Sequence, residues 1–163
     1  MSFKLSTRAR YALRMMLDIA RNGGESEPVS LSGVSERTRV SRGYLEQLAI
    51  VLRNHNLLRG VLGKQGGYRL ARPAQEITLR EVVEASIGPI AILDCVLEPD
   101  HCAQSEACEC RFLYLLINHR VVQVFEDYSL ADLIRPGWAA TVKRALEEGD
   151  TLVLPKVAEG KTG

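Results

Sequence analysis

The sequence lacks long apolar runs and has little proline or histidine. No uninterrupted apolar stretch approaches the ~20 residues of a membrane-spanning helix. Near the start, Arg14 and Asp18 interrupt every stretch that could form the apolar part of a signal peptide, so none is expected. With 6 Pro and 13 Gly in 163 residues, extended disorder is not expected either. We therefore expect a globular cytoplasmic protein with one hydrophobic core and no membrane contact.

Groupings typical of catalytic sites are also missing. The chain holds only 3 His. The sequence contains no Ser/His/Asp set, no pair of carboxylates with catalytic spacing and no phosphate-binding glycine loop. We therefore expect that the protein is not an enzyme.

Cysteine is scarce, and all 4 cysteines fall between positions 95 and 110. Cytoplasmic thiols stay reduced, so clustered cysteines there indicate metal or redox chemistry before a structural disulfide. The spacing C-x6-C-x5-C-x-C lacks the close pairs of structural zinc sites and the C-x2-C-x2-C run of ferredoxins. The acidic residues around it suit a cofactor that carries cations. An iron–sulfur site, a thiol or disulfide switch, a zinc site and cysteines without function all remain open.

Charge is unevenly divided along the chain, although the net charge is only +1. Residues 1–73 hold 13 Lys and Arg against 5 Asp and Glu, whereas residues 74–163 hold 8 against 15. A basic segment of this length is typical of a nucleic-acid-binding module, the alternative being a solvated surface without a partner.

The basic part has the pattern of a winged helix-turn-helix. We expect helices over residues 7–22, with Ser6 as the cap, over 31–38, and from a Ser41 cap to about 54. Two extended runs, 57–61 and 68–71, surround a glycine-rich loop and predict a β-hairpin, or wing. The fold class is therefore mostly α with a small β-hairpin, followed by a long helix.

The first turns of the second helix of a helix-turn-helix read base edges in the major groove. Arg42 suits a phosphate or a guanine, Glu46 a cytosine amino group and Gln47 an adenine. A wing lies along phosphates or in the minor groove. The candidate DNA-binding residues are Ser41, Arg42, Gly43, Tyr44, Glu46, Gln47, Gly63, Lys64, Gln65, Gly66 and Gly67.

The remaining elements follow from caps and periodicity. Thr78 and Glu81 form a capping box for a helix over 79–86. The cysteine segment is expected to be a polar loop. The helix that follows, over 111–125, is apolar on more than one side, so a second subunit is expected to cover it, although the core helix of a monomer is the alternative. Short helices are expected over 130–134 and 138–147.

Several segments together resemble the winged-helix bacterial transcription regulators of the Rrf type, which include IscR, NsrR and CymR. They are STRARYALRMMLDIA, SRGYLEQL, GKQGGYRLAR, ITLREVVEA, and the cysteine segment followed by SLADLI. The resemblance covers residues 3 to about 135. It implies a DNA-binding homodimer paired through the long helix, in which the preceding loop often holds an iron–sulfur cluster that controls DNA binding.

The resemblance also implies a set of metal ligands. Cys95, Cys102 and Cys108 match three cysteines of the cluster-binding members, with one extra residue in the first gap. Arg111 stands where IscR-type members have a histidine, and Arg10 stands where NsrR-type members have an acidic residue. The fourth ligand is therefore open. The candidates, in order, are Cys110, His101 and a group from the partner subunit.

We therefore expect a homodimeric repressor that binds a double-stranded DNA operator and senses iron–sulfur, redox or nitrosative status through a [2Fe–2S] rather than a [4Fe–4S] cluster. A cofactor-free regulator, controlled by a protein partner or by thiol oxidation, is the alternative. The expected organisation is a winged helix-turn-helix domain (1–75), a connecting helix (76–92), a cysteine-rich sensor loop (93–110), the dimerisation and docking helices (111–135) and a C-terminal extension (136–163).

Overall fold

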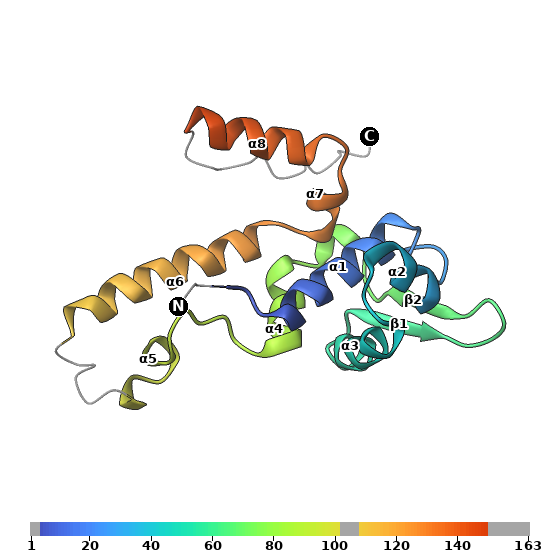
Figure 1. Ribbon diagram of the computed structural model, residues 1–163, viewed down its shortest axis with the longest axis horizontal. Coiled ribbons are helices and arrows are strands. Elements are labelled where there is room, and N and C mark those ends of the chain that lie inside the picture. Colours follow the sequence, from blue (N-terminus) through green and yellow to red (C-terminus); the bar gives the residue numbers. More distant parts are fainter. Residues whose placement is uncertain (1–3, 102–107, 150–163) are drawn as a thin grey trace, which may run out of the picture.

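The computed structural model of the protein describes residues 4–101 and 108–149. A globular unit holds α1 to α4 and the hairpin, and α6 extends from it with α5 at its far end (Figure 1). The predicted fold class, mostly α with one small β-hairpin, is confirmed. The elements are α1 (Thr7–Arg21), α2 (Leu31–Thr38), α3 (Arg42–Asn54), β1 (Leu58–Val61), β2 (Gly67–Leu70), η1 (Ala74–Glu76), α4 (Leu79–Ile87), α5 (Asp94–Leu97), η2 (Pro99–His101), α6 (Glu109–Asp127), α7 (Leu130–Ile134) and α8 (Trp138–Glu148).

Helix α1 runs through the centre of the globular unit. Its fully buried side chains Met15, Met16 and Ile19 belong to one core with residues of α2, α3, α4 and α7. The Ser6 hydroxyl accepts a hydrogen bond from the Ala9 backbone N–H at 3.1 Å, which satisfies one of the free donors at the start of the helix. The predicted helix and its cap are confirmed.

Helices α2 and α3 meet at a tight turn, as the sequence predicts. Arg39 takes a left-handed backbone conformation there, with φ 61° and ψ 25°, and Val40 is buried. Helix α3 begins after Ser41, at the predicted position, but the Ser41 hydroxyl makes no capping hydrogen bond within the described residues. The buried side of α3 includes Leu45, Leu48 and Leu52. The opposite side of the helix, including that of its first turn, is exposed to solvent.

The hairpin pairs β1 and β2 antiparallel, with Leu58 opposite Leu70. The strand bounds lie within one residue of those predicted. A bridge that the sequence did not predict adds Val29 to the edge of β2, because Val29 and Tyr68 exchange two backbone hydrogen bonds of 2.9 Å. This bridge fixes the base of the hairpin to the loop that precedes α2.

Helix α4 begins with the predicted capping box. The Thr78 hydroxyl accepts from the Glu81 backbone N–H, and the Glu81 carboxylate accepts from the Thr78 backbone N–H. Arg72, which follows the hairpin, donates to the same carboxylate at 2.7 Å. Burial raises the pKa of Glu81, but the hydrogen bonds from Arg72 and Thr78 outweigh it and the pKa is lowered overall. The end of the wing is thereby tied to α4.

The described part of the cysteine segment contains short helical turns where a polar loop was predicted. Residues 94–97 form α5 and residues 99–101 form a 3₁₀ turn. The prediction that the long helix starts at Arg111 was also wrong, because α6 starts at Glu109. Apolar periodicity starts only at Phe112, whereas a first helical turn is favoured by acidic residues such as Asp94 and Glu109, which periodicity does not register.

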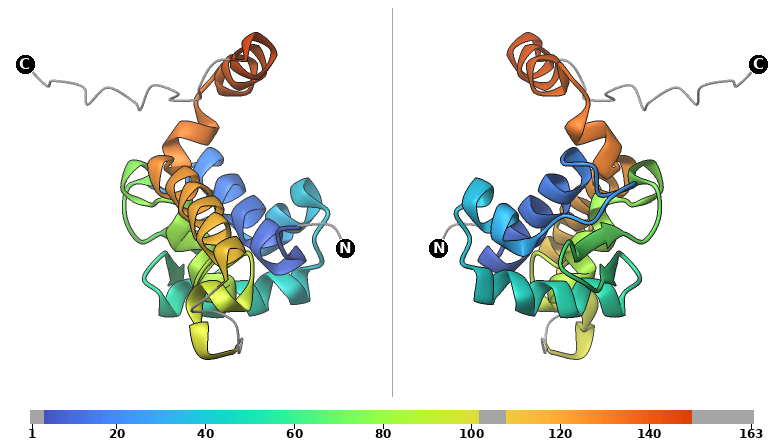
Figure 2. Two further views of the ribbon diagram at one scale, coloured as in Figure 1. Left: turned by 90° about the vertical axis from the view of Figure 1, so that its left-hand side faces the viewer. Right: turned by 90° about the vertical axis from the view of Figure 1, so that its right-hand side faces the viewer.

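The last two helices of the described residues are α7 and α8, both at the predicted positions. Ser129 and Asp132 form a second capping box at the start of α7, whose Leu130 is fully buried in the core. The Trp138 ring then packs edge-on against Tyr128, with centroids 6.3 Å apart. Helix α8 stands apart from the globular unit in both views of Figure 2. In the ranges 4–101 and 108–149, no helix is both long and apolar enough to cross a membrane.

Candidate DNA-binding surface and cysteine segment

The first two turns of α3 present a polar, solvent-facing surface. Ser41, Arg42, Gly43, Glu46 and Gln47 are all exposed. They lie on the side of α3 opposite its buried leucines, so the fold holds the helix from behind and leaves these side chains free to meet a ligand. At Gly43 a Cβ atom would have no protein atom within 4 Å. Glycine is therefore not needed there by the fold.

Arg42 and Glu46 are paired one helical turn apart. Arg42 Nε donates to Glu46 Oε1 at 3.0 Å, and Arg42 Nη1 lies 3.4 Å from the Ser32 hydroxyl of α2. Both charged side chains are at least half exposed, so the pair contributes under about 1 kcal/mol and opens at little cost. The two groups are therefore available to separate partners when α3 docks.

Tyr44 differs from the other predicted residues of α3 because it is half-buried. Its ring packs edge-on against Tyr11 of α1, with centroids 5.7 Å apart and planes at 88°. The Arg14 guanidinium lies 5.9 Å from the centre of the Tyr11 ring. Tyr44 therefore fixes α3 on α1, and its predicted contact with DNA stays a prediction.

The wing residues divide into two groups. Lys64 and Gln65 are exposed at the tip, beside Gly63 with φ 112°. A Cβ atom on Gly66 would collide with the Val61 carbonyl oxygen, and one on Gly67 with the carbonyl of Val29. Because protein backbone fills those positions, these two glycines are required for the wing to fold, whether or not DNA approaches them.

The described cysteines lie on α5 and at the start of α6. Cys95 is half-buried on α5, Cys108 is the half-buried N-cap residue of α6, and Cys110 is exposed in the first turn. Cys102 lies outside the described residues. The Arg111 backbone N–H donates to the Cys108 carbonyl and its Nε donates to the Cys95 carbonyl, both at 3.1 Å. One residue thus joins the two cysteine-bearing backbones.

The described cysteines do not yet form a metal site. Among residues 4–101 and 108–149, no three His, Cys, Asp or Glu side chains converge closely enough to hold a metal ion. Cys108, the N-cap residue of α6, has an extended backbone with φ −87° and ψ 104°, and Cys110 lies in the first turn of the helix. Thiolates are the donors that iron–sulfur clusters need, and Arg111 holds the backbones of Cys95 and Cys108 together.

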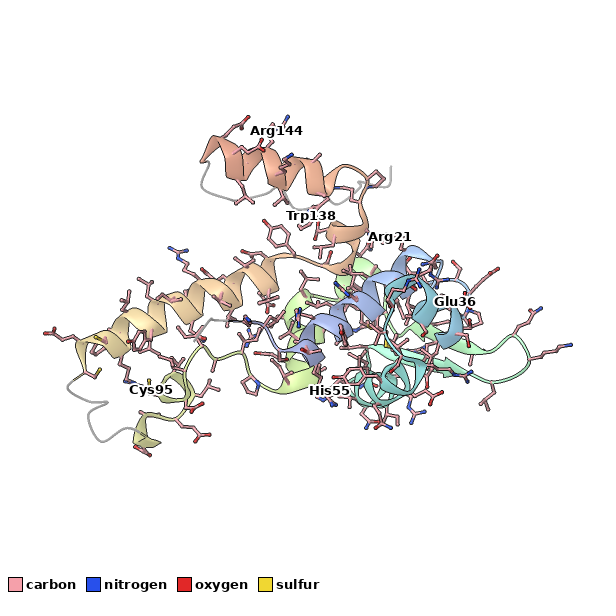
Figure 3. The ribbon with its side chains drawn as sticks, in the orientation of Figure 1. Arg21, Glu36, His55, Cys95, Trp138 and Arg144 are labelled. Atoms are coloured by element: carbon pink, nitrogen blue, oxygen red, sulfur yellow. The ribbon has the colours of Figure 1, made fainter. Side chains whose placement is uncertain are left out.

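A buried amide on α6 fixes residues 90–92, which directly precede the cysteine segment. On α6, Asn118 Nδ2 donates to the Ile90 carbonyl at 3.2 Å, and Asn118 Oδ1 accepts from the Ile92 backbone N–H at 3.0 Å. Ile90 in turn packs with Ala9 of α1 and Val83 of α4 in a small buried cluster. Cys95 lies at the end of the molecule opposite Glu36 of α2 (Figure 3). The contacts of Asn118 and Ile90 lie on α6, α1 and α4, and therefore cover part of the distance between Cys95 and α2.

Sequence reasoning missed several of these contacts. Asn118 stands inside an apolar helix pattern and gives no motif, and the reach of Arg111 to Cys95 depends on how α5 folds back. Arg39 and Leu62, the latter 99% exposed in the hairpin loop, were also not selected. The left-handed turn at Arg39 carries no glycine to mark it.

Comparison with known proteins agrees with this arrangement. The sequence profile of the Rrf2 family, described as "Iron-dependent Transcriptional regulator", matches residues 5–136. Protein rrf2 of Nitratidesulfovibrio vulgaris is 37% identical over 132 residues, which are 81% of this chain and 87% of that protein. The structure of CymR, the global cysteine regulator of B. subtilis, aligns with a TM-score of 0.68 at 29% identity, over 82% of this chain and 97% of that one. The structure of T. potens IscR aligns with a TM-score of 0.62 at 28% identity, over 93% of each chain.

The family match covers the helix-turn-helix, the wing, the cysteine segment and α6, and it stops before α8. Its members are transcriptional regulators and not enzymes. The chain therefore belongs to the Rrf2 family and is a DNA-binding transcriptional regulator of the winged helix-turn-helix class.

Proposed function

We propose that this regulator binds its operator as a homodimer and that an iron–sulfur cluster held by the cysteine segment controls its affinity for DNA. The observation that carries the proposal is the position of Arg111, which joins Cys95 and Cys108 at the start of the helix proposed to pair the subunits. The description of the family as iron-dependent supports the cofactor.

The proposed dimer interface is the apolar stripe on the outer side of α6. Its members are 42% to 63% exposed, although they are large and apolar: Phe112, Leu113, Leu116, Ile117 and Val124. The opposite side of α6 packs on the protein's own core through Val121, Val122 and Phe125. A contiguous apolar surface of this size on a soluble protein marks an interaction site, and a second copy of α6 offers the same surface in return.

Operator reading is assigned to the exposed residues of α3 and the wing. Glu46 and Gln47 would reach base edges, Arg42 would hold a phosphate or a guanine, and Lys64 would lie along the backbone. Two recognition helices in a symmetric dimer would meet adjacent half-sites about one helical turn apart.

Glu46→Ala is expected to relax sequence preference and to leave non-specific affinity the same or slightly higher. The carboxylate would no longer select a cytosine amino group, a discrimination of about 1–3 kcal/mol, and Arg42 would lose its charged neighbour. Lys64→Ala is the contrasting variant, expected to weaken binding to all sequences and to reduce the salt slope by about one. Competition binding with operator variants measures both. If Glu46→Ala keeps the wild-type preference, the assignment of α3 as the reading helix is wrong.

Cys95, Cys102 and Cys108 would hold the cluster, which when bound supplies a site that oxidants and nitric oxide can alter. The fourth ligand stays open between Cys110, His101 and a group from the partner subunit. Two residues of the protein would then transmit a change at the cluster to the DNA-binding helices. Arg111 holds Cys95 to α6, and Asn118 fixes residues 90–92, which pack through Ile90 on α1 and α4. A shift of the segment would therefore move α6 against the helices that support α3.

Anaerobic purification of the full-length protein, followed by visible absorption and iron and sulfide analysis, tests the cofactor. We expect a coloured protein with iron and sulfide in equal amounts, and two of each per site for a [2Fe–2S] cluster. A colourless, iron-free protein after reconstitution would exclude the cluster and leave DNA binding untouched.

A second candidate is a regulator of the same fold controlled by thiol oxidation without a cluster. The exposed thiol of Cys110 favours it, as does the likeness to CymR, the global cysteine regulator of B. subtilis. In that case the protein would stay iron-free, and oxidation followed by mass mapping would reveal a disulfide or a modified Cys110.

A further inference from the structure

The turn between α2 and α3 contains an arginine in a conformation that arginine rarely adopts. Arg39 has φ 61° and ψ 25°, in the left-handed region. In the ranges 4–101 and 108–149 the one other non-glycine residue with positive φ is Asn56, whose short polar side chain tolerates this conformation. For arginine the contact between its Cβ and the backbone is unfavourable, and glycine would avoid it.

The fold does not need the Arg39 side chain to make this turn. The Arg39 backbone N–H donates to the Ser35 carbonyl at 2.9 Å, and the Ser35 hydroxyl donates to the Val40 carbonyl at 2.7 Å. Val40 is then buried in the core. Since backbone, hydroxyl and apolar contacts hold the turn, a glycine at position 39 would give the same turn with less strain. Strain that the surroundings impose is a reason to look for a function of the side chain.

The Arg39 guanidinium is available to a ligand. The side chain is exposed and has no hydrogen bond or ion pair in the described part of the chain. Its neighbour Arg37 differs, because Asp18 accepts hydrogen bonds from both Nε and Nη2 of Arg37. Arg39 thus carries an uncompensated positive charge two residues before Ser41, the N-cap residue of α3.

We propose that Arg39 binds a phosphate of the DNA backbone and anchors the start of α3 against the strand that borders the major groove. This inference rests on the proposed docking of α3. When the start of a recognition helix enters the major groove, the residues just before it lie near the flanking phosphates. A guanidinium suits this role, because it donates two parallel hydrogen bonds to phosphate oxygens.

Three substitutions separate the charge of Arg39 from its backbone conformation. Arg39→Gly removes the charge and the strain, Arg39→Asn removes the charge but keeps a side chain that tolerates the turn, and Arg39→Lys keeps the charge. Arg144→Gln is the control, because Arg144 is an exposed arginine on α8, far from Glu36 of α2 (Figure 3). The readouts are the melting temperature and the affinity for operator and random-sequence duplexes over a range of salt.

We expect Arg39→Gly to raise the melting temperature by about 2–4 °C and at the same time to weaken DNA binding. For both Arg39→Gly and Arg39→Asn, affinity should fall roughly three- to tenfold for operator and random DNA alike, with a salt slope lower by about one. Arg39→Lys should keep the wild-type slope, and Arg144→Gln should keep the wild-type affinity.

Wild-type affinity and slope in Arg39→Gly would overturn the phosphate contact. Weaker binding by Arg39→Gly but not by Arg39→Asn would overturn it as well, because flexibility of the turn would then explain the loss. The docking of α3 is judged separately. If Glu46→Ala and Lys64→Ala also bind as the wild type does, the proposed docking of α3 is wrong. If only the Arg39 variants bind as the wild type does, the docking stands and the Arg39 contact does not.

Discussion

Leu116→Glu is expected to convert the dimer into monomers and to lower operator affinity at least about a hundredfold. Leu116 lies near the middle of the exposed stripe on α6. Full burial of a leucine contributes about 1.5–3 kcal/mol, and a carboxylate left without a partner in an apolar interface costs more than that gain. Each subunit carries the substitution, so the loss counts twice, and about 2.8 kcal/mol already corresponds to a hundredfold change in the dimer dissociation constant.

DNA binding should fall with dimerisation because a monomer holds only one half-site. The second recognition helix would no longer bind within the same complex, and the advantage of linked sites would be lost. Sedimentation velocity over a range of protein concentrations measures the oligomeric state, and circular dichroism checks that the helices remain.

Ile87→Glu is the matched control. Ile87 is an exposed apolar residue at the end of α4, outside the stripe, with the same 42% exposure as Ile117. It should leave the dimer intact. If Leu116→Glu sediments as the wild type does, α6 is not the dimer interface, and the stripe must have another partner.

Substitution of Cys95, Cys102 and Cys108 together by alanine is expected to abolish the cofactor and the response of DNA binding to it. These thiols supply most of the ligand set, and iron–sulfur clusters depend on thiolate ligands. Coupling between two sites typically amounts to about 1–3 kcal/mol, so the wild-type protein should change its operator affinity roughly 5- to 150-fold between its loaded and empty forms. The triple variant should bind with one affinity under all loading conditions.

Cys110→Ala is the comparison for the triple variant, because it removes a cysteine of the same segment and leaves the three proposed ligands in place. If another group is the fourth ligand, this variant should keep the visible absorption, the iron and the response. Two other results are informative. Loss of the cluster in Cys110→Ala would make it the fourth ligand, and a normal operator response in the triple variant would favour control by a protein partner.

Much of the fold could be predicted because local signals agree with the tertiary structure. Ser6 and Thr78 mark helix starts whose side-chain caps the structure contains, and the glycine-rich loop marks the hairpin. Ser41 marks the start of α3 but makes no capping hydrogen bond within the described residues. The segment around Cys95 was less predictable, because α5 is a single turn held by the distant side chain of Arg111.

The candidate site was predicted in outline and not in its contacts. Periodicity indicates which residues lie on the exposed face of a helix, so the exposure of Glu46 and Gln47 could be predicted. The pairing of Arg42 with Glu46, the packing of Tyr44 on Tyr11 and the need for Gly67 beside Val29 depend on how elements meet, which periodicity does not describe. The domain boundaries at 75, 92, 110 and 135 and the predicted DNA and metal contacts stay predictions.

Control of DNA binding by the cysteine segment is tested most directly by the operator affinity of the loaded and the iron-free protein. Both forms should come from one anaerobic preparation of the full chain, and the DNA should be a duplex that the protein itself selects from random sequences. Fluorescence anisotropy then gives both affinities at one salt concentration. The proposal predicts values that differ at least about fivefold, with the difference lost in the triple cysteine variant. Equal affinities for the two forms would contradict it.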